Sequence, residues 1–208
     1  ALHREGVTFV LDRAGITGAD GPSHHGMWDL SLLGLVPGLH LAAPRDEQRL
    51  REALDTAIGI GDAPSVVRFS KDPLPEPLPA LRTIGTIDVL FEQGDNQVLV
   101  VGWGQFAGAA VEVGQRLSQQ GIGVRVVDPV WALPVSEDLI RLAGAHGLVI
   151  TLEDGGLAGG LGSRLAQECR LAGVSANVRE FGVPQQFIDQ GTRSGILEEL
   201  GLTAQHVA

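Results

Sequence analysis

The chain has little cysteine, few basic residues and no long apolar run, and each scarcity excludes a class of protein. Its 208 residues contain one cysteine, Cys169, so no disulfide can form within the chain, which suits a reducing compartment. Lysine and arginine number 15 against 25 acidic residues, and the net charge of −10 argues against a nucleic-acid-binding surface. No run approaches the roughly 18 apolar residues of a membrane span. The 44% of hydrophobic residues then predicts a globular, soluble, cytoplasmic protein that binds neither nucleic acid nor membrane.

Apolar runs alternate with amphipathic stretches along most of the chain, a pattern typical of α/β proteins. The longer expected helices lie at 45–60, 107–119, 136–145 and 162–171. Strands are expected at 7–12, 39–43, 65–69, 97–102, 124–127, 148–152 and 176–181, with a strand or loop at 84–91. Right-handed crossovers between such elements would build a mainly parallel sheet with helices on both faces.

The clearest domain boundary is a run of alternate prolines at Pro73, Pro75, Pro77 and Pro79. Because proline cannot continue a helix or a central strand, this spacing predicts an extended linker. We therefore expect a first domain at 1–72, a Pro-rich linker and connecting segment at 73–93, and a second domain at 94–208. The first part is short for a doubly wound domain, so we expect the chain to begin inside a domain whose earlier strands are absent.

The glycine-rich segment 12–26 follows the first expected strand and carries Arg13, Asp20 and His24. In open α/β sheets, ligand sites lie beyond the carboxyl ends of the strands. We expect these three side chains to converge there on one crevice that takes a small polar ligand. Arg68 and Lys71 follow another strand and would come to the same sheet edge, where two cations would suit a phosphate. Adjacent His24 and His25 cannot easily face one ion, so no metal site is expected.

Residues 102–107 match the dinucleotide pattern G-x-G-x-x-G/A, with Asp128 at the place of a ribose-binding acid. This pattern alone would indicate an NAD-binding module. However, Trp103 is bulky where a pyrophosphate must approach closely, and a plain strand-to-helix turn explains the glycines equally well.

A second glycine cluster, at 155–163, precedes another expected helix. It could hold an anion at the helix N-terminus or pack against another domain or subunit. Glu153 and Asp154 just before it could act in acid–base chemistry, or more simply cap the helix.

Several motifs, in this order along almost the whole chain, resemble the C-terminal part of the 1-deoxy-D-xylulose-5-phosphate synthases, thiamine-diphosphate enzymes of the transketolase superfamily. The matching residues are Asp12-Arg13-Ala14-Gly15, Asp20-Gly21, His24, Asp29-Leu30-Ser31, Arg68-Phe69, Glu153-Asp154-Gly155, Gly159-Gly160 and Gly162-Ser163. The resemblance implies the end of a doubly wound pyrimidine-binding domain followed by a complete transketolase C-terminal-like α/β domain. It also implies a homodimer.

In such enzymes pyruvate loses carbon dioxide and the remaining two-carbon unit joins glyceraldehyde 3-phosphate, a step toward isoprenoid precursors and thiamine. By resemblance, Arg13 and Lys71 bind the substrate's phosphate, although the family usually has arginine where Lys71 stands. Asp20 and His24 would be the catalytic residues that hydrogen-bond its hydroxyl and carbonyl. Thiamine diphosphate and Mg²⁺ would be held mainly by a portion that this chain lacks, so the chain alone is expected to be inactive.

Three other interpretations stay open alongside the NAD-binding module. Two belong to the same superfamily: a transketolase fragment and a fragment of the β subunit of a 2-oxo acid dehydrogenase. The third is a catalytically inactive assembly module.

Overall fold

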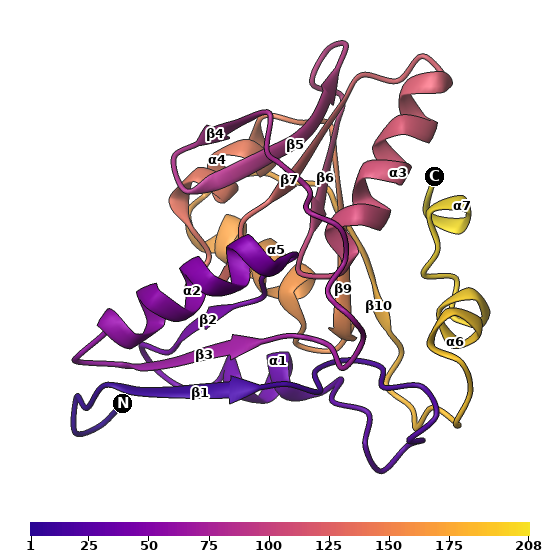
Figure 1. The fold of residues 1–208 in the computed structure, drawn as a ribbon. Helices are drawn as coiled ribbons and strands as arrows, with labels where there is room; N and C mark the ends of the chain where they lie inside the picture. Colours follow the sequence, from indigo (N-terminus) through magenta and orange to yellow (C-terminus); the bar gives the residue numbers. More distant parts are fainter.

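The computed structural model describes residues 1–208 and contains two sheets (Figure 1). The smaller sheet has the strand order β1-β3-β2-β8, with β1 at Val7–Leu11, β3 at Pro64–Arg68, β2 at His40–Ala42 and β8 at Trp131–Leu133. β1, β3 and β2 are parallel, and β8 is antiparallel to β2. Because β8 comes from the second half of the chain, both halves contribute to this sheet.

The larger sheet has the order β10-β9-β6-β7-β5-β4, with strands at Val178–Val183, Leu148–Gly156, Val98–Gly102, Val124–Asp128, Ile87–Gln93 and Arg82–Ile84. β10, β9, β6 and β7 are parallel, and the pair β5 and β4 is antiparallel. The predicted α/β class with a mainly parallel sheet is confirmed. The segment expected as a strand or loop at 84–91 contributes to this hairpin, so part of the connecting segment belongs to the larger sheet.

The helices are α1 at Asp29–Leu33, α2 at Glu47–Gly59, α3 at Phe106–Gln119, α4 at Glu137–Gly144, α5 at Leu161–Leu171, α6 at Arg193–Glu199 and α7 at Ala204–Val207. α2 begins two residues later than expected because Asp46 is its N-cap and accepts a hydrogen bond from Arg49 N at 2.9 Å. Leu50, Ala53, Leu54 and Ala57 recur in the sequence at i, i+3, i+4 and i+7, which predicts one apolar face. This face is confirmed, since Ala53 and Ala57 are buried in one cluster with Val67, and Leu50 and Leu54 pack against it. None of the helices has the length and apolar character needed to span a membrane.

The central strands are buried on both faces, so successive residues belong to different cores. On β6, Val98 and Val100 pack in one cluster with Phe106 and with side chains of α6 and α7. Leu99 and Val101 pack in the other, with side chains of α4 and α5. Accordingly α3, α6 and α7 lie on one side of the larger sheet and α4 and α5 on the other (Figure 1).

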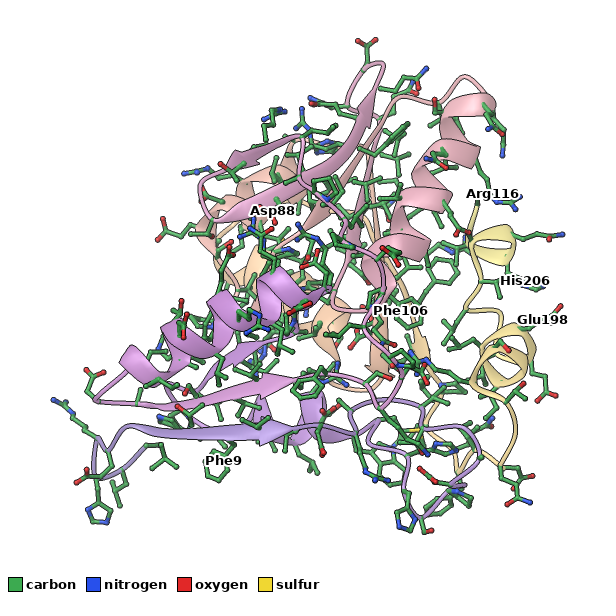
Figure 2. All side chains as sticks on the ribbon, in the orientation of Figure 1. Phe9, Asp88, Phe106, Arg116, Glu198 and His206 are labelled. Carbon is green, nitrogen blue, oxygen red and sulfur yellow. The ribbon has the colours of Figure 1, made fainter.

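A buried ionic cluster joins the start of α2 to the larger sheet. Arg45 Nη1 lies 2.7 Å from Asp88 Oδ2 of β5 and 2.8 Å from Asp128 Oδ2 of β7. Arg49 Nε and Nη2 donate to the two carboxylate oxygens of Asp88, at 2.8 and 2.7 Å, and Figure 2 shows Asp88 between α2 and β5. Burial raises the pKa of Asp128 to about 6, while the charge of Arg45 opposes that shift. Two arginines and two aspartates therefore fix α2, which packs against β3 of the smaller sheet, to the larger sheet.

β1 is an edge strand whose apolar side chains are open to solvent. Val7, Phe9 and Val10 are 47%, 52% and 52% exposed, and Phe9 projects away from the ribbon in Figure 2. An apolar edge strand offers unpaired backbone groups together with apolar surface, so it is a natural place for another strand or subunit to bind.

Candidate active site

The loop at 12–27 leaves β1 at the edge where its parallel neighbour β3 also ends. The segment that follows β3 therefore meets the loop, as expected for the carboxyl ends of adjacent strands. Lys71 Nζ donates to Asp20 Oδ2 at 2.7 Å, and Arg13 Nη1 lies 3.6 Å from the same oxygen. Asp20 thus joins two cations that come from separate strands of the sheet.

The charges around Asp20 favour its ionised form. The hydrogen bond from Lys71 is the main cause that holds the pKa of the Asp20 carboxyl below its usual value, and the charges of Arg13 and His24 add to it while desolvation opposes it. The side chains of Arg13 and Lys71 are 58% and 37% exposed. We call Arg13, Asp20, His24 and Lys71 the Asp20 cluster. Because the cluster has two cations and only one carboxylate, it can attract a small anion.

The neighbouring histidines have different surroundings. His24 is exposed, and its Nδ1 lies 2.9 Å from Ser23 Oγ. His25 is buried, and its Nδ1 accepts a hydrogen bond from Thr17 N at 3.1 Å. A ring nitrogen that accepts carries no proton, so this bond requires the Nε2–H tautomer of neutral His25. His25 therefore holds the loop together, and His24 is the histidine that a ligand can reach.

Arg68, which the sequence places near Lys71, is not part of the exposed cluster. Its side chain is buried and donates to Asp29 Oδ2 at 2.7 Å and to the main-chain oxygen of Asp154 at 3.1 Å. It joins α1 to the end of β9. Its charge is already paired there, so its role is structural.

Asp154, near the end of β9, binds the backbone of the 12–27 loop. Its Oδ1 accepts from Ile16 N at 3.0 Å, and its Oδ2 accepts from Arg193 Nη2 at 2.6 Å. Gly15 passes so close, at φ +74°, that a Cβ there would lie 2.1 Å from the Asp154 carboxyl. Arg193 is a site residue that the sequence does not reveal, because no local pattern marks a residue whose partner Ile16 lies 177 positions away.

Glu153 caps the N-terminus of α5. Its two carboxyl oxygens accept from Leu161 N and Gly162 N, each at 2.9 Å. Burial raises the pKa of Glu153 to about 7, and the two hydrogen bonds oppose that shift. The capping interpretation is confirmed for Glu153, but it is wrong for Asp154, whose carboxyl oxygens accept from Ile16 N and Arg193 Nη2 instead. Because Glu153 occupies these N–H groups, they are not free to hold the anion considered from the sequence.

The glycine cluster at 155–163 packs against the first half of the chain. Gly156 N donates to Met27 O at 2.7 Å, and Ser31 Oγ donates to Ala158 O at 2.7 Å. Of the interpretations left open for this cluster, the structure supports packing against another domain.

The segment 102–107 does not form an open dinucleotide site. Trp103 is 2% exposed, and Asp128 is fully buried. The Asp128 carboxylate is already bonded to Arg45 Nη1 and to Val130 N, each at 2.8 Å. A ribose cannot reach it there, so the NAD-binding alternative is disfavoured and the glycines serve a strand-to-helix turn.

A largely apolar cavity of about 510 Å³ lies where the two halves of the chain meet. It is lined by Trp28, Ser31, Leu32, Gly156, Ala158, Gln185, Gln186 and Phe187. Trp28 and Phe187 meet edge to face there, with ring centroids 5.6 Å apart. This cavity could not be predicted from the sequence, because its walls come from three distant segments.

Comparison with known families accounts for both halves of the chain. The family described as "Transketolase, C-terminal domain" matches residues 87–207, and "Transketolase, pyrimidine binding domain" matches residues 1–77. The chain belongs to the transketolase family. Among solved structures, a split-gene transketolase in an inactive β4 tetramer matches this transketolase-family chain with a TM-score of 0.81 and 30% identity, over 97% of this chain and 64% of that one. A transketolase mutant from Pichia stipitis matches with a TM-score of 0.79 at 21% identity, over 100% of this chain and 30% of that one, and shows the shared fold.

Curated relatives of this transketolase-family chain carry a more specific name. The protein named 1-deoxy-D-xylulose-5-phosphate synthase in Clavibacter sepedonicus is 54% identical over 100% of this chain and 32% of its own length. The protein of the same name in Rhodococcus erythropolis is 53% identical over 100% of this chain and 33% of its own length. The chain thus spans about a third of the relatives that it matches.

Proposed function

We propose that the chain is the acceptor-binding part of a thiamine-diphosphate-dependent 1-deoxy-D-xylulose-5-phosphate synthase. Such an enzyme condenses pyruvate with glyceraldehyde 3-phosphate to 1-deoxy-D-xylulose 5-phosphate and carbon dioxide. The proposal is supported by the relatives of that name, which match along the whole chain at 50–54% identity. The observation that carries it is the contact of both Lys71 and Arg13 with Asp20 at the carboxyl edge of two parallel strands.

In this proposal the Asp20 cluster binds the phosphorylated aldehyde. Arg13 and Lys71 hold the phosphate, Arg13 through its planar fork and Lys71 as a point charge. Asp20 accepts a hydrogen bond from the hydroxyl of the aldehyde. His24 donates from Nε2, the ring nitrogen not engaged with Ser23, to the carbonyl oxygen as negative charge develops there.

Thiamine diphosphate supplies the carbanion chemistry of this reaction when it is bound. The residues of this chain do not fit its magnesium ion, because no three His, Cys, Asp or Glu side chains lie close enough together to hold a metal ion. We therefore place the binding of Mg²⁺ and of the diphosphate mainly outside these 208 residues, and we assign the acceptor-binding groups to this chain.

We also propose that the enzyme is a cytoplasmic homodimer. The similar split-gene transketolase is described as a tetramer. Light scattering of the whole enzyme at several concentrations measures its oligomeric state, and a monomer at every concentration would contradict the proposal.

The test of function uses the whole enzyme that contains this chain and the variant Arg13→Ala. Loss of a phosphate contact raises the KM for glyceraldehyde 3-phosphate, by roughly tenfold or more if the contact is charge-assisted. Pyruvate decarboxylation measured without acceptor should stay near the wild-type rate. A loss confined to decarboxylation contradicts the acceptor role of Arg13.

Substrate profiling separates the related activities. The unmodified enzyme should use glyceraldehyde 3-phosphate with pyruvate and should use neither a lipoamide acceptor nor a ketose phosphate donor. A preference for ketose phosphates would indicate a transketolase, and a preference for lipoamide would indicate the β subunit of a 2-oxo acid dehydrogenase.

A further inference from the structure

Arg193, the first residue of α6, contacts three separate segments through three different nitrogen atoms. Its Nη1 donates to the main-chain oxygen of Ile16 at 2.6 Å, and its Nη2 donates to Asp154 Oδ2 at 2.6 Å. Its Nε lies 3.0 Å from Asp72 Oδ2. The guanidinium therefore bridges the 12–27 loop, the end of β9 and the segment that follows β3.

Two of these segments carry the Asp20 cluster. Ile16 lies between Arg13 and Asp20 on the loop, and Asp72 is the direct neighbour of Lys71. One guanidinium thus holds the backbone oxygen of Ile16 on one side and the carboxylate of Asp72 on the other side of the place where the two phosphate-binding cations are proposed to act. A planar group with several donors in fixed directions sets such distances better than a flexible ammonium can.

The surroundings of Arg193 strengthen its contact with Asp154 in particular, whereas Asp72 is 43% exposed. The side chain of Arg193 is 13% exposed and that of Asp154 is 7% exposed, so solvent competes little for the pair. Asp154 in turn accepts the N–H of Ile16, so Arg193 and Asp154 together bind the donor and the acceptor of one residue. The backbone of α6 also packs closely there, since a Cβ on Gly18 would lie 3.1 Å from Arg193 N.

We propose that Arg193 is a positioning residue for acceptor binding: it fixes the loop of Arg13 and the segment of Lys71 at the separation that a phosphate needs. The inference rests on the proposed function of the Asp20 cluster. Arg193 itself touches no substrate in this proposal and acts through the backbone of Ile16 and the carboxylate of Asp72.

The test compares Arg193→Met and Arg193→Lys with Arg51→Met in the whole enzyme. Arg51 is a matched control because it forms only an exposed pair with Glu47 within α2, with side chains 75% and 58% exposed. Hydrogen exchange followed by mass spectrometry reports the loop directly, on peptides that cover 12–27. We expect exchange in this loop to be about tenfold faster in Arg193→Met, intermediate in Arg193→Lys and unchanged in Arg51→Met.

Kinetics supply the readout that a merely structural role would not move. We expect Arg193→Met to lower kcat/KM for glyceraldehyde 3-phosphate roughly ten- to hundredfold, with decarboxylation of pyruvate alone preserved. Asp72→Asn, an exposed change that keeps the loop contacts, should raise the KM by a smaller factor. It also provides a folded variant if Arg193→Met fails to fold.

The possible failures are distinguishable. Unchanged loop exchange in Arg193→Met overturns the positioning role whatever the function is. Faster loop exchange in Arg193→Met without any change in acceptor kinetics would show that Arg193 holds the loop but does not position the acceptor. If Arg13→Ala also leaves the acceptor kinetics unchanged, the proposed function fails as well. Equal loss of decarboxylation and of acceptor use would show a general structural role, which also overturns the inference.

Discussion

Arg45 Nη1 and Asp128 Oδ2 lie 2.8 Å apart in the buried region between the two sheets, although 83 positions separate them in the chain. Their side chains are 3% and 0% exposed. Removing one partner of a buried pair leaves the other charge without compensation, which costs more than the pair itself contributes. The contact therefore couples the stability of the two halves.

Replacing Arg45 by methionine should destabilise the chain strongly. It leaves Asp88 and Asp128 buried with less compensation, and such losses reduce the free energy of unfolding by about 3–5 kcal/mol. Urea unfolding measures the change. Arg51→Met breaks an exposed pair and should cost less than about 1 kcal/mol. Similar losses in the two variants would contradict the role given to Arg45.

Replacing Lys71 by methionine should raise the pKa of Asp20 toward its ordinary value. The hydrogen bond from Lys71 is the largest cause of the lowered pKa, and the charge of Arg13 is a smaller one. Carboxyl carbon NMR across a pH titration reports Asp20 directly. Arg13→Met should raise the pKa of Asp20 too, but by less. A larger rise in Arg13→Met than in the Lys71 variant would show that Arg13, and not Lys71, is the main cause of the lowered pKa.

The meeting of Lys71 with the loop of Arg13 and Asp20 could be predicted from sequence, because one rule governs it. Carboxyl ends of parallel neighbours share an edge, so recognising two strands was sufficient to place their following segments together. The apolar face of α2 followed from helical periodicity in the same way.

The contacts of Arg193 with Asp154 and of Arg45 with Asp128 could not be predicted. The chain has 15 basic and 25 acidic residues, so the possible pairs are many and local sequence does not choose among them. The same holds for β8, whose three residues pair with β2 of the other half. Such contacts depend on how the sheets pack. A partner that lies far along the chain produces no periodic pattern in the sequence from which it could be recognised.

The pH dependence of stability should change when Glu153 is replaced by glutamine. The folded pKa of about 7 exceeds the ordinary value of 4.5, so the folded state holds this proton more tightly. The contribution of Glu153 to the free energy of unfolding therefore falls as pH rises from about 4.5 to about 7, by on the order of 2–3 kcal/mol.

Glutamine cannot titrate, so any deficit of Glu153→Gln relative to wild type should shrink between pH 5 and pH 8. Urea unfolding of both proteins across this range measures the difference. Glu112→Gln on the exposed side of α3 serves as the charge-removal control. A deficit that grows with pH would mean that Glu153 is stabilised as a carboxylate, contrary to its burial.

Two glycines with nearly the same backbone angle separate the cost of backbone strain from the cost of a clash. Gly15 and Gly38 have φ of +74° and +71°. A Cβ on Gly38 would meet nothing within 4 Å, whereas one on Gly15 would lie 2.1 Å from the carboxyl of Asp154. Gly38→Ala should therefore cost only the left-handed backbone penalty, roughly 1–2 kcal/mol.

Gly15→Ala should cost distinctly more than Gly38→Ala, since the methyl group must also displace the Asp154 carboxylate from Ile16 N and Arg193. Urea unfolding of the two variants gives the difference in the free energy of unfolding, which isolates the close approach. Hydrogen exchange should become faster in the 12–27 loop of Gly15→Ala and stay unchanged there in Gly38→Ala. Equal destabilisation of the two variants, with unchanged hydrogen exchange in the 12–27 loop, would mean that the Asp154 side chain can move aside without loss of stability. Its contact would then not hold the loop.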